Sequence, residues 1–239
     1  AIYLVTTIIF DLDDTLLWDK QSIQTAFDQT CAFAAQRYPQ LDPKQFEEAT
    51  RNVARRIYQQ YETFDHTVKI GINPFEGLWG TFNDEGVMFQ KMYELMPEYQ
   101  RRTWTLGLEA FGIEDPSFGE ELAQKFREAR LQSPTLYEDT FSVLDTLRDK
   151  GYRMIMLTNG SPSLQNTKLK LTPELVPYFD HIVISGDFGI GKPDASIFEH
   201  VLNIANLDAS DALMVGDNLM TDILGSSRVH MRNVWINRD

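Results

Sequence analysis

Three aspartates crowd the stretch that follows the first apolar run of the chain. Asp11, Asp13 and Asp14 come directly after residues 8–10, Ile-Ile-Phe, and Thr15 follows them. Carboxylates are costly to bury unless a cation or hydrogen-bond donors compensate their charge. Two carboxylates this close can hold Mg²⁺, or one can attack an electrophile while the other transfers a proton. The alternative is an acidic turn that caps the next helix.

Later segments also place polar side chains where an expected strand gives way to a turn. They supply a hydroxyl, an amide, an ammonium group and two carboxylates: Thr158, Asn159, Lys192, Asp217 and Asp222. The hydroxyl and the amide suit phosphate oxygens, and a lysine in a glycine-rich turn can neutralise a phosphate or a carboxylate. Each has an ordinary alternative, namely a β-turn before a helix, a surface lysine, and an acidic residue that stabilises a helix N-terminus.

The elements that must position these residues alternate between strand and helix. Short apolar runs predict strands at residues 7–10, 153–157, 181–184, 212–215 and 233–236. Helical spacing predicts helices at residues 140–150, 163–171, 196–205 and 222–228. Strands separated by helices form a parallel sheet with right-handed crossovers, and the first strand must join it because it has no other partner. Ligands of such sheets lie beyond the carboxyl ends of the strands, which is where the polar residues fall.

The long stretch after the first strand is expected to be helical. It predicts a helix capped by Ser22, a second that begins at Asp42 and Pro43 and extends to Tyr61, and further helices at 84–96, 98–111 and 117–131. Residues 71–83 predict a loop, whose aromatic side chains either line a substrate entrance or pin the loop to its domain. The expected organisation is a discontinuous α/β domain, residues 1–17 and 135–239, with an all-helical domain, residues 18–134, inserted into it.

Composition narrows the class of partner and the compartment. The formal net charge of −13 argues against nucleic acid or an anionic membrane as a partner. Cys31 is the only cysteine, and a buried thiol in a reducing compartment is expected. The first ten residues lack a basic leader, so they are expected to begin the fold rather than to form a signal peptide. These features favour a cytoplasmic protein and leave the choice between monomer and homodimer open.

Taken in order, four segments resemble the motifs of the haloacid dehalogenase-like (HAD) hydrolase superfamily. The segments are DLDDT at 11–15, LTNG at 157–160, GKPD at 191–194 and GDNLMTD at 216–222. The inserted helical block is similar to the C1-type cap of subfamily I, and the resemblance covers the whole chain. It implies a Rossmann-like α/β core and a Mg²⁺-dependent phosphatase, because most members of the superfamily are such enzymes.

The resemblance also implies catalytic roles. Asp11 is expected to attack phosphorus and form an aspartyl-phosphate. Asp13 is expected to protonate the leaving alcohol and then to activate the water that hydrolyses the intermediate. The family's dehalogenases lack a carboxylate two residues after the nucleophile, because a leaving halide needs no proton. Asp13 therefore favours phosphoryl transfer over dehalogenation.

The remaining roles concern binding. Thr158 and the backbone of Asn159 are expected to hold phosphate oxygens, and Lys192 to orient the nucleophile and offset charge. Mg²⁺ is expected to bind Asp11, the carbonyl of Asp13, and Asp217, while Asp222 supports these ligands.

The expected function is hydrolysis of a small phosphomonoester, of the nucleotide or sugar phosphate class. Two alternatives stay open: a phosphomutase of the same superfamily, and a non-catalytic protein that binds a phosphorylated metabolite. One departure from related chains is His230, which stands where they usually have glycine before the last strand. Histidine tolerates left-handed backbone better than most residues, so we expect only a local adjustment there.

Overall fold

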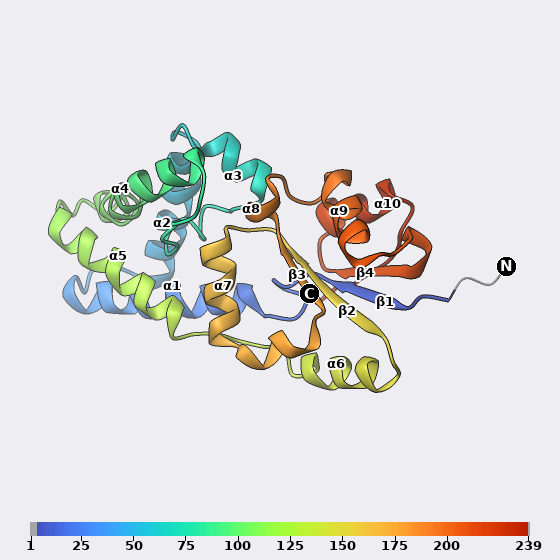
Figure 1. Ribbon diagram of the computed structural model, residues 1–239. Coiled ribbons are helices and arrows are strands. Elements are labelled where there is room, and N and C mark those ends of the chain that lie inside the picture. The colour runs from blue at the N-terminus through green and yellow to red at the C-terminus, as the bar shows by residue number, and fades with distance from the viewer. Residues whose placement is uncertain (1–3, 239) are drawn as a thin grey trace. The chain divides into compact units, whose positions relative to one another are not determined.

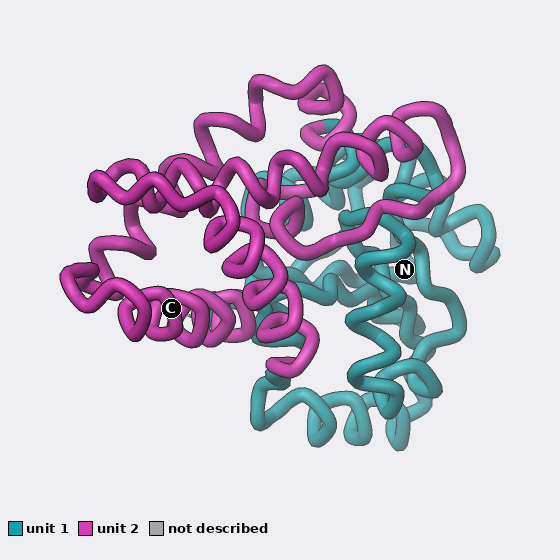
Figure 2. The backbone as a smooth tube through the Cα atoms, turned by 90° about the vertical axis from the view of Figure 1, so that its left-hand side faces the viewer, with its two compact units in different colours: residues 1–19, 69–71, 135–239 teal, residues 20–68, 72–134 magenta. Residues whose placement is uncertain are grey.

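A computed structural model describes residues 4–238 of the chain. The chain forms two compact units, coloured separately in Figure 2. The first comprises residues 1–19, 69–71 and 135–239, and the second comprises residues 20–68 and 72–134. The predicted domain boundaries, at residues 17/18 and 134/135, stay a prediction. The first strand begins at Thr7, and residues 1–3 lie outside the described part of the chain.

The first unit contains a five-stranded sheet in the order β3-β2-β1-β4-β5. The strands are β1 (Thr7–Phe10), β2 (Arg153–Thr158), β3 (His181–Ile184), β4 (Ala212–Gly216) and β5 (Arg232–Trp235), and all pairs are parallel. The predicted strands are therefore confirmed to within one residue at each end. The chain steps from β1 to β2 and β3 on one side and then returns to β4 on the other. The order thus reverses beside β1, which is where open α/β sheets bind ligands.

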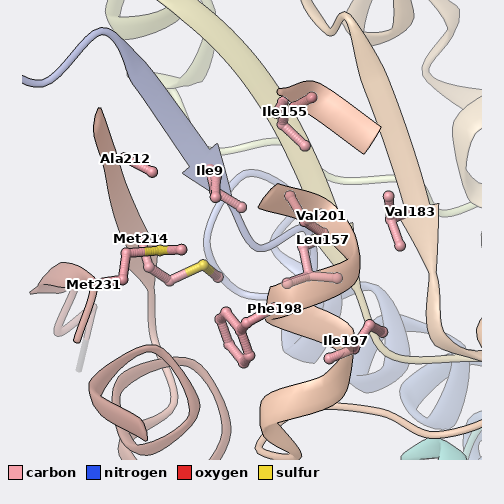
Figure 3. Packing of buried hydrophobic residues seen from close by; sticks show 11 residues of the cluster. Ile9, Ile155, Leu157, Val183, Ile197, Phe198, Val201, Ala212, Met214 and Met231 are labelled. Carbon is pink, nitrogen blue, oxygen red and sulfur yellow. The ribbon is translucent and has the colours of Figure 1, made fainter. Parts of the chain in front are cut away.

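Helices cover both faces of this sheet (Figure 1). Alternate side chains of β1 pack on opposite faces of the sheet, because successive side chains of a strand point to opposite sides. Figure 3 shows Ile9 in the cluster on one face, which the α9 (Ala195–Ala205) side chains of Phe198 and Val201 complete. Ile8 packs on the other face with buried leucines of α6 (Thr140–Asp149) and α7 (Pro162–Leu171). Burial on both faces explains why residues 8–10 of β1 are a continuous apolar run.

The remaining elements of this unit are short. They are the 3₁₀ turns Pro173–Tyr178 and Ala209–Asp211, α8 (Ser185–Phe188), a π-helical turn (Leu219–Ile223) and α10 (Leu224–Arg228). The expectation that a helix begins at Asp222 is wrong. Asn218 caps the preceding turn by accepting a hydrogen bond from the backbone of Met220, and Asp222 lies one turn inside it. His230 has a φ of 60°, so the expected left-handed conformation is confirmed.

Five helices form the inserted block: α1 (Asp19–Arg37), α2 (Pro43–Tyr58), α3 (Phe64–Ile70), α4 (Val87–Glu109) and α5 (Pro116–Leu131). The predicted cap at Ser22 is wrong, because α1 already begins at Asp19. The predicted break between 96 and 98 is also wrong, because Pro97 lies inside α4. Met96 before the proline and Tyr99 after it are both fully buried, so packing on one face maintains the helix despite the hydrogen bond that proline removes.

Aromatic side chains fill the core of the second unit. Trp104 and Phe126 are fully buried and lie against Phe27, and the predicted buried position of Cys31 is confirmed. The predicted loop at 71–83 contains no regular helix or strand, and its Trp79 is 5% exposed with an arginine over its ring. The loop aromatics thus pack into the helical unit. Among the described residues, no helix is both long and apolar enough to cross a membrane.

Candidate active site

A buried lysine lies between carboxylates at the carboxyl ends of the strands. The Lys192 ammonium group is 2.8 Å from Oδ1 of Asp11, 2.7 Å from Oδ1 of Asp222 and 2.7 Å from the carbonyl oxygen of Leu157. Lys192 is 5% exposed and Asp222 is fully buried. Buried charges require such compensation, so the predicted surface-lysine alternative does not apply to Lys192.

Local structure explains how these side chains reach one another. The Asn159 amide donates to the carbonyl of Lys192 at 3.0 Å and accepts from its backbone N–H at 2.9 Å. This reciprocal pair ties the turn after β2 to the turn before α9. On the other side, a Cβ atom at Gly216 would collide with the carboxylate of Asp222, so glycine allows that carboxylate to approach β4.

The pKa values reflect the charge distribution. Burial is the largest influence on the pKa of Lys192 and lowers it, but Asp11 and Asp222 outweigh burial and hold the pKa above its ordinary value. Burial and the neighbouring Asp11 raise the pKa of Asp222 to about 6, although Lys192 acts in the opposite direction. The lysine therefore stays charged at neutral pH and holds negative charge beside it.

A second feature is the approach of Asp217 to Asp11. Carboxylate oxygens of Asp11, Asp217 and Asp222 lie within 4.8 Å of one another, and the Thr15 hydroxyl lies 3.2 Å from Asp11 Oδ2 and 3.3 Å from Asp217 Oδ1. Burial, followed by a hydrogen bond to Asp11 and repulsion by it, raises the pKa of Asp217 to about 8. Without a cation the carboxylates compete for a proton. Oxygen donors in this arrangement fit a divalent metal ion, which would remove the repulsion.

The side chain of Asp13 has hydrogen-bond donors of its own. Lys168 Nζ is 2.9 Å from Asp13 Oδ2, and Gln165 Nε2 is 3.1 Å from the same oxygen. Burial raises the pKa of Asp13, Lys168 opposes that effect, and Asp19 adds to it. The side chain as a whole is 23% exposed, although its Oδ1 atom is buried, and Asp13 is a carboxyl group whose proton affinity is increased.

The structure thus brings the sequence-predicted residues to one edge of the sheet. Thr158 is buried at the end of β2, where its hydroxyl lies 2.7 Å from Gln165 Nε2. Asp222 pairs with Lys192, and its Oδ2 atom also accepts a hydrogen bond at 3.2 Å from the backbone N–H of Asn218, which caps the turn. Sequence reasoning missed Gln165 and Lys168. Their spacing in the sequence places them near the apolar Leu164 on one side of an expected helix. The structure shows that all three side chains are buried.

Replacing Lys192 by methionine is expected to lower the free energy of unfolding by about 3–5 kcal/mol, as when one partner of a buried ion pair is removed. The substitution keeps the length of the side chain but leaves Asp11 and Asp222 without their shared cation. Urea unfolding of the metal-free protein measures the change. Lys150→Met, at an exposed position, is the matched control and should unfold like the unsubstituted protein. Equal stability of the two variants would contradict this reading of the lysine.

Comparison with known proteins identifies the family and the fold of the chain. The family model of haloacid dehalogenase-like hydrolases matches residues 5–230. The chain is 29% identical to the phosphoserine phosphatase of Thermus thermophilus over 97% of this chain and 88% of that protein. It is 37% identical to the N-acylneuraminate-9-phosphatase of Rattus norvegicus over 53% of this chain and 51% of that protein. Among solved structures, the magnesium-bound HAD hydrolase YfnB of Bacillus subtilis has a TM-score of 0.64 at 22% identity, covering 99% of this chain and 90% of that one.

The chain belongs to the haloacid dehalogenase-like hydrolases. The two relatives named above are phosphatases. The resemblance of the four motifs and the α/β fold with its helical insertion are both confirmed.

Proposed function

We propose that the protein is a Mg²⁺-dependent phosphatase that hydrolyses a small phosphomonoester through an aspartyl-phosphate on Asp11. The observation that carries this proposal is the placement of one carboxylate, Asp11, against both a buried ammonium group and a second carboxylate. Its Oδ1 atom lies 2.8 Å from Lys192, and its other oxygen shares the Thr15 hydroxyl with Asp217. A nucleophile held in this way has a fixed orientation for attack.

Asp11, Asp217 and the backbone carbonyl of Asp13 would hold the metal ion, with Asp222 supporting them through Lys192. The bound ion would offset the charge of the phosphate and so reduce its repulsion by the carboxylates. The known magnesium site of YfnB supports this choice of ion, since that protein shares the fold. Oxygen ligands of this number and charge also suit Mg²⁺ in general.

The reaction has two steps, and Asp13 acts in both. In the first, an oxygen of Asp11 bonds to phosphorus, the ester P–O bond breaks, and Asp13 donates its proton to the departing alkoxide. In the second, Asp13 takes a proton from water, the hydroxide bonds to phosphorus, and the Asp11–phosphorus bond breaks. The raised pKa of Asp13 supports its first role, because an acid must hold its proton near neutral pH.

The names of the relatives and the polar groups of the site support a proposal for the substrate class. Among the matched relatives are proteins named for phosphoserine, an N-acylneuraminate 9-phosphate and a pyrimidine 5'-nucleotide, all small phosphorylated metabolites. The Thr158 hydroxyl at the end of β2 and the backbone of Asn159 would bind the phosphate oxygens. We propose a substrate of this size, in the sugar phosphate or nucleotide class.

A panel of phosphorylated metabolites tests the proposal. The purified protein with Mg²⁺ is expected to release inorganic phosphate in equal amount to the free alcohol from at least one member. Isomerised sugar phosphate without phosphate release would identify a phosphomutase instead. Tight binding of a metabolite without turnover would identify a non-catalytic binding protein.

A further inference from the structure

Two buried donors from one helix converge on a single oxygen of Asp13. Lys168 and Gln165 project from the same side of α7, and both are almost inaccessible, at 2% and 0% exposure. Both contact Oδ2 of Asp13, at 2.9 Å and 3.1 Å. We propose that Lys168 and Gln165 are positioning residues that hold Asp13 by Oδ2 and thereby present Oδ1 for proton transfer. This inference rests on the proposed role of Asp13 as acid and base.

The two oxygens of Asp13 differ in their surroundings. Oδ2 accepts from an ammonium group and an amide, whereas Oδ1 is buried and accepts no hydrogen bond from any described residue. Donors on one oxygen restrict rotation of the carboxylate about its Cβ–Cγ bond. The other oxygen keeps its lone pairs for a proton, so the asymmetry selects the oxygen that exchanges protons with alcohol or water.

Gln165 connects Asp13 to the expected phosphate site. Its Nε2 atom also lies 2.7 Å from the Thr158 hydroxyl oxygen. Because the amide nitrogen donates this hydrogen bond, the Thr158 hydroxyl keeps its own hydrogen for a phosphate oxygen. The absence of a side chain at Gly160 makes room, since a Cβ atom there would lie 2.6 Å from the Gln165 side chain. One amide therefore orients both the proton-transfer group and a phosphate donor.

A purely structural role for Lys168 is the competing explanation. Its ammonium group is also 3.7 Å from Asp19, the first residue of α1, so the lysine compensates two carboxylates. Loss of that compensation would lower the stability of the fold even if Asp13 had no role in proton transfer. The two explanations differ in how the effect of the substitution depends on the leaving group and on the presence of the Asp13 carboxylate.

The leaving group provides the first test. Phenyl phosphate and p-nitrophenyl phosphate have similar shapes, but phenoxide is the stronger base and gains more from a proton donor. Lys168→Met is expected to lower kcat/KM for phenyl phosphate by about 10²-fold, the effect of a misplaced reacting group, and to affect p-nitrophenyl phosphate less. Lys170→Met, at an exposed position on the same helix, should match the unsubstituted enzyme for both. Equal losses on both substrates would overturn the inference.

A double-mutant cycle provides the second test. If Lys168 acts through Asp13, then Lys168→Met should cause no further loss of kcat/KM in an Asp13→Asn background. Losses that multiply would overturn the positioning role. Full activity of Asp13→Asn on phenyl phosphate would instead overturn the proposed function. A large loss for Asp13→Asn, together with normal activity for Lys168→Met, would overturn only the present inference.

Gln165→Met keeps the tests decisive if Lys168→Met does not fold, because it removes a donor without leaving a charge uncompensated. Its loss of kcat/KM should be larger on phenyl phosphate than on p-nitrophenyl phosphate, and in the Asp13→Asn background only the part of the loss that passes through Thr158 should remain. Circular dichroism establishes whether each variant is folded. Asn166→Met, an exposed neighbour on α7, is its matched control and should retain full activity. Normal activity of a folded Gln165→Met would contradict its part in holding Asp13.

Discussion

Asp11→Asn is expected to reduce phosphate release by roughly 10⁶-fold, the order of loss seen when a covalent enzyme is deprived of its nucleophile. The amide occupies the same volume but is a far weaker nucleophile than a carboxylate. The expected loss is therefore in kcat, and substrate binding should persist. Phosphate release under single-turnover conditions measures the effect, and mass spectrometry of the quenched protein should detect the phosphorylated form only when Asp11 is present.

The variant should remain folded for a physical reason. The substitution removes the attraction between Asp11 and Lys192, but it also removes the repulsion that raises the pKa of Asp217. Asp149→Asn, whose side chain is 73% exposed, is the matched control and should keep full activity. Full activity of a folded Asp11→Asn variant, or a phosphoryl group on another residue, would refute the assignment of the nucleophile.

Removal of divalent metal ions is expected to abolish phosphate release, and addition of Mg²⁺ is expected to restore it. Without the ion, a phosphate dianion would approach the carboxylates of Asp11, Asp217 and Asp222, which lie within 4.8 Å of one another. Their repulsion opposes binding of substrate and attack by Asp11. Treatment with EDTA followed by dialysis and titration with Mg²⁺ checks this expectation.

The pH dependence of metal binding gives a second measurement. The pKa of Asp217 is raised to about 8 when no cation is bound, so protons compete with the metal below that pH. The apparent affinity for Mg²⁺ should rise as the pH increases toward 8 and then level off. Asp217→Asn should weaken Mg²⁺ binding and remove most of this pH dependence. Activity that survives chelation unchanged would exclude the metal from the reaction.

The central strands were predictable from sequence because β1 and most of β2 are buried on both faces, whereas the edge strand β5 is largely exposed. A continuous apolar run followed by polar residues is typical of a buried strand. Residues 7–10, which precede Asp11, are an example. Parallel strands end at the same edge of the sheet, so the order of the motifs alone predicted that Asp11, Lys192 and Asp217 would lie near one another. The roles assigned to these residues remain predictions, which the variants described above test.

The features that sequence analysis missed depend on packing. A proline disrupts a helix that has no packing partners. In α4, the buried residues on both sides of Pro97 keep the helix continuous. Lys168 and Gln165 are polar residues in a helix of ten residues, and spacing alone does not tell which of its faces is buried. Their relation to Asp13 crosses more than 150 positions of the chain. Such a contact can be predicted only when the order of the strands, and with it the position of α7 relative to β1, is known.

The contacts of Lys192 have a consequence for how substrate is bound. A primary ammonium group carries three hydrogens, and here Asp11, Asp222 and the Leu157 carbonyl accept one each. No hydrogen of this group is left over for an incoming phosphate. We therefore expect the lysine to act on the substrate through its electric field and by holding Asp11 in place, and we expect the Thr158 hydroxyl, backbone amides and a bound metal ion to contact the phosphate directly.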